Sequence, residues 1–247
     1  MKHEIIVTDL TRMQRGMVCI AGYDDQHACF RPVLAPPGIP EASLLRKGEA
    51  QVFPFARVEF DFIRATPQPP HTEDFRYQPS SVRLVGRVTD AEGVLQWSLF
   101  PGVQDIFGQP VQFGPGHYVS DGTGARSLGT IRPPTPVEVI YAQEKSGEAW
   151  DYRIRFEDGH HKSYRLKVTD LTWQCHCASL QSAGLDAKSI SQRLTQTLAS
   201  ATVYLRIGLS RGWTKFPDRC YLQINAVHTF PDYLEGRVFS DFARTGK

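Results

Sequence analysis

The chain has 247 residues, of which 41% are hydrophobic and 22% charged, and its formal net charge is +2. This length suffices for one large domain or two of ordinary size, and the composition is that of a packed globular protein. The net charge excludes a strongly acidic or strongly basic chain. The sequence contains no apolar run of about 18 residues, so we predict no transmembrane helix.

The N-terminal segment does not resemble a secretory signal. The first 16 residues lack a long apolar core and contain charges at Asp9 and Arg12. The five cysteines are an odd number and do not form the pattern of a disulfide framework. We therefore predict a cytoplasmic protein with reduced thiols.

The charge is unevenly distributed along the chain. Residues 1–130 hold 12 Lys and Arg against 14 Asp and Glu, a sum of −2, whereas residues 131–247 hold 16 against 12, a sum of +4. A basic C-terminal half permits a polyanionic partner without requiring one.

Alternating and β-branched segments predict a first barrel over residues 1–90. The predicted strands are residues 3–9, 17–23, 27–34, 52–63 and 82–88, with a short helix over residues 41–47. The order of three strands, a helix and two strands fits an OB fold, a five-stranded Greek-key barrel.

Residues 91–136 interrupt this rhythm. Residues 94–108 have a loose apolar stripe broken by Pro101, which predicts partly helical structure. Residues 114–136 are rich in Gly, Ser and Pro and are longer than a tight turn, so we interpret them as an ordered or semi-ordered linker between two domains.

The same order of elements returns in residues 137–236. Strands are predicted at residues 137–141, 151–157 and 162–170, then a helix over residues 186–200, and finally a hairpin of alternating strands over residues 203–226. The fold class is therefore mainly β with minor α: two tandem OB-like β-barrels joined by a partly helical, Gly/Pro-rich connection. Residues 237–247 form a C-terminal tail.

Short motifs spread over nearly the whole chain resemble the prokaryotic dual OB-containing domain family. They are VTDLTR, VCIAG and RPV within residues 7–33, PHTEDF at 70–75, GARSLGTI at 124–131, VTDLT at 168–172, and VYLRIGLSR with CYLQINAVHTFPDYL near the end. The resemblance implies two OB folds and a nucleic-acid or nucleotide-binding role in bacterial defence or mobile-element neighbourhoods. It implies no established enzymatic activity.

The second barrel contains the strongest candidate for a nucleic-acid site. An OB fold usually binds its ligand on strands two and three, beside the loop between strands four and five. The predicted contacts are four cations on strands two and three and four residues in or next to the loop: Arg153, Arg155, Arg165, Lys167, Arg211, Trp213, Lys215 and Phe216. Cations neutralise phosphates, and aromatic side chains stack on bases at about 1–3 kcal/mol each. The alternative is a solvated face whose cations pair with Glu157 and Asp158.

The polar face of the final hairpin is a second candidate. It carries Tyr204, Arg206, Tyr221, Gln223 and Asn225, which combine stacking surface with donors and acceptors for a base edge. We favour the alternative that this face contacts the first barrel, with Arg206 paired to a carboxylate. Asp9 and Arg12, beside Arg31, are candidates for a buried or interdomain salt bridge.

Two clusters have residue types that bind metals or transfer protons. His71, Glu73 and Asp74 lie in the loop between strands four and five of the first barrel, where a structural role is favoured over a catalytic one. The sequence Cys175-His176-Cys177 has closer spacing than structural zinc sites use, so we expect ordinary thiols near a strand end. We predict no catalytic residues, no metal and no cofactor.

The sequence thus favours a non-enzymatic protein that binds nucleic acid, single-stranded DNA or RNA, by electrostatic capture and stacking. One alternative is a nucleotide-binding sensor or enzyme with a ligand cleft between the barrels, lined by His71, Glu73, Asp74 and Arg206. Another is an adaptor that docks a partner effector protein.

Overall fold

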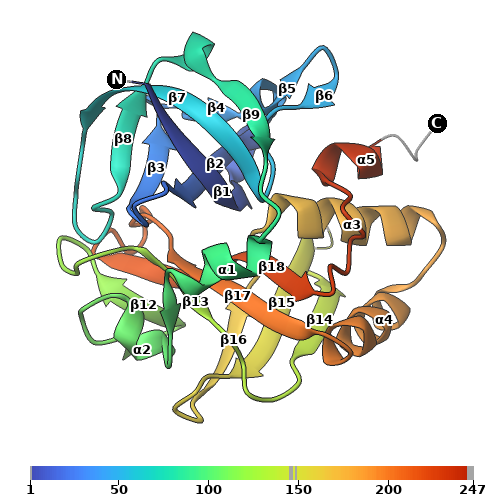
Figure 1. The fold of residues 1–247 in the computed structure, drawn as a ribbon. Helices are drawn as coiled ribbons and strands as arrows, with labels where there is room; N and C mark the ends of the chain where they lie inside the picture. Colours follow the sequence, from blue (N-terminus) through green and yellow to red (C-terminus); the bar gives the residue numbers. More distant parts are fainter. Residues whose placement is uncertain (1, 145–146, 148, 244–247) are drawn as a thin grey trace.

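The chain folds into two units made mainly of β-strands. The computed structural model describes residues 2–144, 147 and 149–243. Figure 1 shows a barrel of blue and cyan strands, and beneath it a curled assembly of green, yellow and orange strands with helices at one side. The predicted fold class of two OB-like units in a mainly β chain is confirmed.

The first unit is a closed five-stranded barrel. Its strands are β1 (Lys2–Arg12), β2 (Met17–Tyr23), β3 (Cys29–Val33), β7 (Ala56–Ala65) and β8 (Asp74–Tyr77). They pair in the order β1-β2-β3-β8-β7, and β7 pairs back to β1. Only the β3–β8 pair of this ring is parallel. Counted along the chain this is the order 1-2-3-5-4 of an OB barrel.

Shorter elements decorate the barrel and differ from two predictions. They are η1 (Gln14–Gly16), β4 (Ile39–Pro40), η2 (Glu41–Leu44), β5 (Leu45–Arg46), β6 (Glu49–Ala50), η3 (Pro79–Ser81) and β9 (Arg83–Arg87). The helix predicted over residues 41–47 is a 3-10 turn followed by β5. The fifth barrel strand is β8, whereas residues 83–87 form β9 beside β7. With four residues after a proline-rich loop, β8 is too short to show an alternating pattern.

Strand β1 is buried on both sides and so links the two units. Ile5, Val7 and Leu10 belong to the apolar core of the barrel. Thr8 and Asp9 are equally buried, at 0% and 1% exposure. A strand covered on both faces loses the usual alternation of buried and exposed residues.

The second unit repeats the strand order but stays open. Its strands are β14 (Glu138–Gln143), β15 (Trp150–Glu157), β16 (Ser163–Lys167), β17 (Thr202–Leu209) and β18 (Arg219–Phe230). The first three pair in sequence, β17 pairs with β18, and a parallel bridge from Val168 to Ile224 joins the two sheets. The order is again 1-2-3-5-4.

Helix α4 (Ala187–Ala199) covers the open edge at β14. The Thr195 and Ser191 hydroxyls accept hydrogen bonds from the backbone N–H groups of Val139 and Tyr141, both at 2.9 Å. These contacts satisfy backbone donors that a neighbouring strand would otherwise bind. The second unit is therefore a curled half-barrel.

Residues 91–136 are built into the second sheet. They form α1 (Ala91–Gln96), β10 (Leu99–Phe100), α2 (Val103–Ile106), β11 (Gln112–Phe113), β12 (His117–Ser120) and β13 (Leu128–Ile131). Strand β13 pairs with β17, and β12 pairs with β18. The segment predicted as a linker thus extends the final hairpin on both sides, and its glycine-rich composition hid these short strands.

Helix α3 (Leu171–Ser182) was not predicted. Asp170 caps it by accepting hydrogen bonds from the N–H groups of Thr172 at 2.8 Å and Trp173 at 3.1 Å. The helix is buried along much of its circumference and has no single apolar stripe. Cys175 and Cys177 therefore lie on a helix, not near a strand end, and α5 (Phe239–Ala243) packs beside it.

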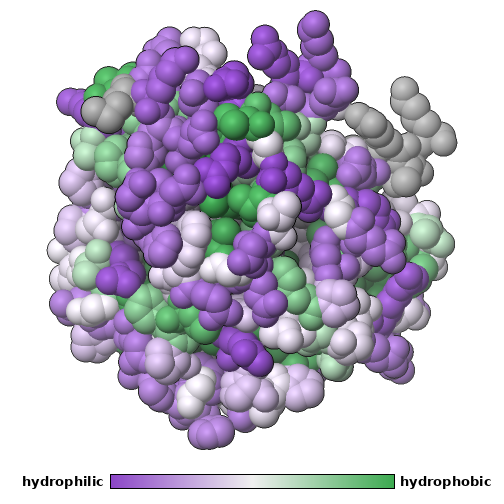
Figure 2. Space-filling view, in the orientation of Figure 1, coloured by the Kyte–Doolittle hydropathy of each residue, from purple (hydrophilic) through white to green (hydrophobic). Residues whose placement is uncertain are grey.

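The view in Figure 2 is largely hydrophilic, and hydrophobic residues show as separate patches. Within the described residues, no helix has the length and apolar character needed to cross a membrane.

Candidate nucleic-acid interface

The outer side of β2 and β3 in the first barrel lies against the second unit. Arg206 of β17 is fully buried there and binds Asp9 of β1, with the Nη2–Oδ2 distance at 2.8 Å. Its Nη1 group donates to the hydroxyls of Tyr23, Ser98 and Thr130 at 2.7–3.1 Å. The expected pairing of Arg206 with a carboxylate is confirmed. Asp9 is in a buried salt bridge between the units, as one expectation had it, but its partner is Arg206 and not Arg12 or Arg31. Arg12, in contrast, pairs with Glu41 at 3.0 Å within the first barrel.

A second buried network joins the same two surfaces. Asp74 binds Arg31 at 2.6 Å and also Arg211, which extends from the end of β17. Glu73 accepts hydrogen bonds from the Ser127 N–H at 2.7 Å and hydroxyl at 3.0 Å. Arg211, predicted to reach a phosphate, thus ties the second unit to the first barrel.

His71 lies beside this network and is 2% exposed. Burial, and then the nearby charges of Arg31 and Arg211, lower the pKa of His71 to about 2, so the ring is neutral at physiological pH. The arrangement of His71, Glu73 and Asp74 supports a structural role. Within the described residues, no three His, Cys, Asp or Glu side chains gather in a group that could hold a metal ion.

Four cations of β15 and β16, called the basic face below, lie on one side of the sheet among carboxylates. Register places Arg155 opposite Arg165 and Arg153 opposite Lys167. Three of them pair with carboxylates: Arg153 with Asp151 at 2.6 Å, Arg155 with Glu138 at 2.7 Å, and Lys167 with Glu144 at 3.3 Å.

These partners differ from the predicted ones, since Asp158 is fully buried and accepts backbone hydrogen bonds instead. Exposed pairs of this kind contribute about 0–1 kcal/mol. Phosphates can therefore compete for the cations.

An aromatic cluster surrounds the loop between β17 and β18; Trp213 and Lys215 are exposed and its other members are half-buried. We define it as Trp213, Phe216, Tyr118 and Tyr221, with Arg219 and Lys215. The Arg219 guanidinium lies 4.7 Å from the ring centres of both Phe216 and Tyr118. Lys215 lies 5.5 Å from the Phe216 ring, and Trp213 is 56% exposed.

The backbone fixes the shape of this loop. Trp213 and Phe216 exchange backbone hydrogen bonds at 3.3 and 2.7 Å. A Cβ atom on Gly212 would lie 2.2 Å from the Pro217 carbonyl oxygen, so the loop requires glycine there. The predicted loop residues Trp213, Lys215 and Phe216 are thus brought together.

Sequence reasoning missed two members of the cluster, Tyr118 and Arg219. Tyr118 comes from β12 and lies opposite Tyr221 in the register with β18. Nothing local in the glycine-rich segment indicates this pairing. Arg219 could have been found, because it alternates with Tyr221 and Gln223 on one face of β18.

Further along β18 the same face becomes buried. Gln223 donates to the Asn225 side chain at 3.0 Å, and Asn225 is 5% exposed where it packs over Gly208. The residues predicted for an inter-barrel cleft therefore separate: Tyr221 belongs to the aromatic cluster, Arg206 lies in the interface, and Asn225 is buried beside Gly208.

One comparison with known proteins identifies a relationship. Residues 3–227 match the family described as the dual OB-containing domain. No curated protein and no solved structure matches the chain.

Proposed function

Because the chain belongs to the dual OB-containing domain family, we propose that it is a non-enzymatic nucleic-acid-binding protein that takes single-stranded DNA or RNA on its second unit. The observation that carries this proposal is the aromatic cluster with Arg219 and Lys215 at the loop between β17 and β18. This is the loop position that OB folds use for oligonucleotides.

The cluster suits single strands because their bases are free to stack. Trp213 offers an exposed ring, and Arg219 is held against two aromatic rings, which places a positive charge beside the stacking surface. Stacking on aromatic side chains tolerates any base sequence. We expect little sequence preference.

The basic face of β15 and β16 supplies the electrostatic contribution. Arg153, Arg155, Arg165 and Lys167 would exchange their carboxylate partners for phosphates, with release of counterions. Affinity would then fall steeply as salt concentration rises.

The alternative of a ligand cleft lined by His71, Glu73, Asp74 and Arg206 is less well supported. Its proposed lining residues Arg206 and His71 are 0% and 2% exposed, and the carboxylates of Glu73 and Asp74 already bind Ser127, Arg31 and Arg211. A role in bacterial defence stays a prediction from the family resemblance, and docking of an effector protein stays an alternative drawn from the sequence.

A binding panel tests the proposal. Fluorescent single- and double-stranded DNA and RNA would be titrated with the protein at low salt, and we expect single strands to bind most tightly. Arg155→Glu with Arg165→Glu reverses a cross-strand pair on the second unit and should abolish binding.

The matched control is Arg64→Glu with Arg76→Glu, an exposed cross-strand pair on the first barrel. It should leave binding unchanged. Absence of binding by the unmodified protein, or equal effects of the two double variants, would refute the proposal.

A further inference from the structure

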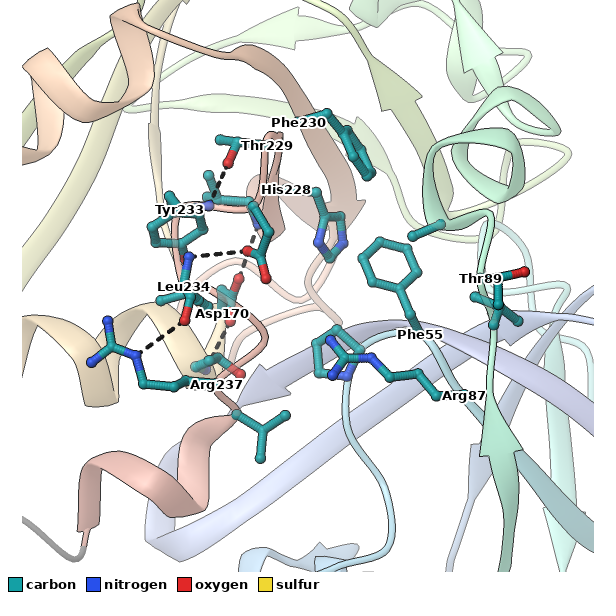
Figure 3. Close-up of a pocket in the computed structure, with 17 residues that line it drawn as sticks. Phe55, Arg87, Thr89, Asp170, His228, Thr229, Phe230, Tyr233, Leu234 and Arg237 are labelled. Atoms are coloured by element: carbon teal, nitrogen blue, oxygen red, sulfur yellow. Dashed lines mark hydrogen bonds between the residues drawn. The ribbon is translucent and has the colours of Figure 1, made fainter.

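A cavity of about 220 Å³ lies far from the aromatic cluster, at the opposite end of β18. Its walls come from the first barrel, from the segment after β9, from the start of α3, and from the residues that follow β18 (Figure 3). We propose that this cavity is a second ligand site, which binds a free mononucleotide with its base inside and its phosphate at Arg87.

The cavity has an aromatic wall. The rings of Phe55 and His228 lie 4.6 Å apart, and Phe230 lines the same space. Figure 3 shows these three side chains side by side. Phe55 is held at a φ of 65°, a conformation that residues other than glycine rarely adopt and that often marks functional positions. A flat heterocycle of the size of a nucleobase fits a small cavity that is lined by aromatic rings.

The acidic groups of the cavity are already satisfied. Asp170 accepts hydrogen bonds from the N–H groups of Thr172, Trp173 and Val227 at 2.8–3.1 Å. Asp232 accepts from the N–H groups of Leu234 at 3.0 Å and Gly236 at 2.7 Å. Neither carboxylate needs a ligand donor.

The unused hydrogen-bonding groups are hydroxyls and a guanidinium. The Thr172 hydroxyl belongs to a residue that is 2% exposed, and it has no hydrogen-bond partner among the described residues. The buried Tyr233 hydroxyl is in the same condition. Both hydroxyl oxygens are closed off from the cavity, so Arg87 is the group that a ligand can reach without a shift of the side chains around these oxygens.

Arg87 is the charged anchor. It donates to the Gly236 carbonyl at 3.2 Å and lies 5.7 Å from the Phe53 ring. In Figure 3 the Arg87 side chain extends toward the middle of the residues that line the cavity. Arg237 points away from them and donates to the Leu234 carbonyl at 3.0 Å. A guanidinium with further N–H groups beside an aromatic cavity matches a phosphate attached to a planar base.

Calorimetric titration with AMP, GMP, CMP and UMP tests this site. At least one should bind one-to-one, and its nucleoside, which lacks the phosphate, should bind at least tenfold more weakly. Arg87→Gln should weaken nucleotide binding at least tenfold. Its matched control, Arg83→Gln, removes an exposed arginine of the same strand that pairs with Glu59 at 3.2 Å, and should bind normally.

A second variant, Phe230→Ala, removes a ring from the aromatic wall and should weaken binding several-fold, with its melting temperature measured alongside. The proposal is overturned if none of the four nucleotides binds at millimolar concentration, or if Arg87→Gln and Arg83→Gln bind alike. Oligonucleotide binding by Arg87→Gln should be normal, so this site and the proposed interface can fail separately.

Discussion

The two OB-like units use the same surface of the fold in opposite ways. In the first barrel the outer side of β2 and β3 packs against the second unit, where Tyr23 and Arg31 are each 4% exposed and a cavity of about 320 Å³ remains. In the second unit the outer side of β15 and β16 remains open, and the Arg155 side chain is 56% exposed. Packing between the units, and not the fold of each unit, therefore decides which surface remains available to a ligand.

Closure of the barrel differs in a related way. Pairing of β1 with β7 closes the first unit, whereas α4 covers β14 in the second and leaves β17 free to pair with β13. Strand β12 likewise pairs with β18 and brings Tyr118 beside Tyr221. The open unit thus pairs with additional strands, and one of them adds Tyr118 to the aromatic cluster.

The largest expected effect comes from removing the buried salt bridge between the two units. Arg206→Leu leaves the Asp9 carboxylate buried without its partner, and loss of one member of a buried pair costs about 3–5 kcal/mol. Denaturant unfolding would measure this loss. Arg155→Leu, which breaks the exposed pair with Glu138, should change stability by no more than about 1 kcal/mol. Similar losses in both variants would contradict the contrast between the units.

The next effect concerns stacking on the open unit. Trp213→Ala should weaken binding of a single-stranded oligonucleotide by about 1–3 kcal/mol, which is roughly a 5- to 150-fold change in Kd. Fluorescence anisotropy measures it. Ile63→Ala removes an equally exposed apolar side chain of the first barrel, at 64% exposure, and should have no effect.

Acid should loosen the interior of both units through buried histidines. Burial is the first cause that lowers the pKa of His71 to about 2 and the pKa values of His176 and His228 to about 4. The unfolded chain therefore binds protons first, and stability is lost as pH falls below about 6.5. Burial raises the pKa of Asp170 to about 7, so the folded chain binds this proton before the unfolded chain does. This one group therefore offsets part of the stability that the histidines lose in acid.

His71→Phe tests the largest of these shifts. Removal of one such group should reduce the slope of unfolding free energy between about pH 4.5 and 6 by up to about 1.4 kcal/mol per pH unit. An unchanged slope in the His71 variant would mean that its ring protonates normally in the folded chain.

The smallest effect is electrostatic. Arg165→Gln should weaken oligonucleotide binding only a few-fold, but it should reduce the slope of log K against log salt by about 0.7, the value for one phosphate contact on a single strand. Arg76→Gln on the first barrel should leave the slope unchanged. A slope that Arg165→Gln does not alter would remove this residue from the interface.

The parts of the fold that the sequence predicted are those with a clear one-sided pattern. Helix α4 has Ile190, Leu194 and Leu198 on one face, and β17 and β18 alternate apolar and polar residues. Helix α3 escaped prediction because Trp173, Cys177 and His176 are all buried, so neighbouring elements cover several of its sides. The spacing of apolar residues along the sequence does not reveal burial by neighbouring elements on several sides of a helix.

The candidate site was predicted in part for a similar reason. Trp213, Lys215 and Phe216 are close in sequence, and their mixture of aromatic and basic groups is visible there. Tyr118 joins them only through pairing with a strand about a hundred residues away. The type of partner for Arg206 was predictable, but its identity was not, because Asp9 lies 197 positions earlier in the chain.

Ultraviolet crosslinking of a bound single-stranded oligonucleotide, with the modified peptides identified by mass spectrometry, tests the central claim most directly. We expect crosslinks on the aromatic cluster, at Trp213, Phe216, Tyr118 or Tyr221, and their loss in the Arg155→Glu, Arg165→Glu variant. Crosslinks confined to the first barrel, with none on the cluster, would contradict it.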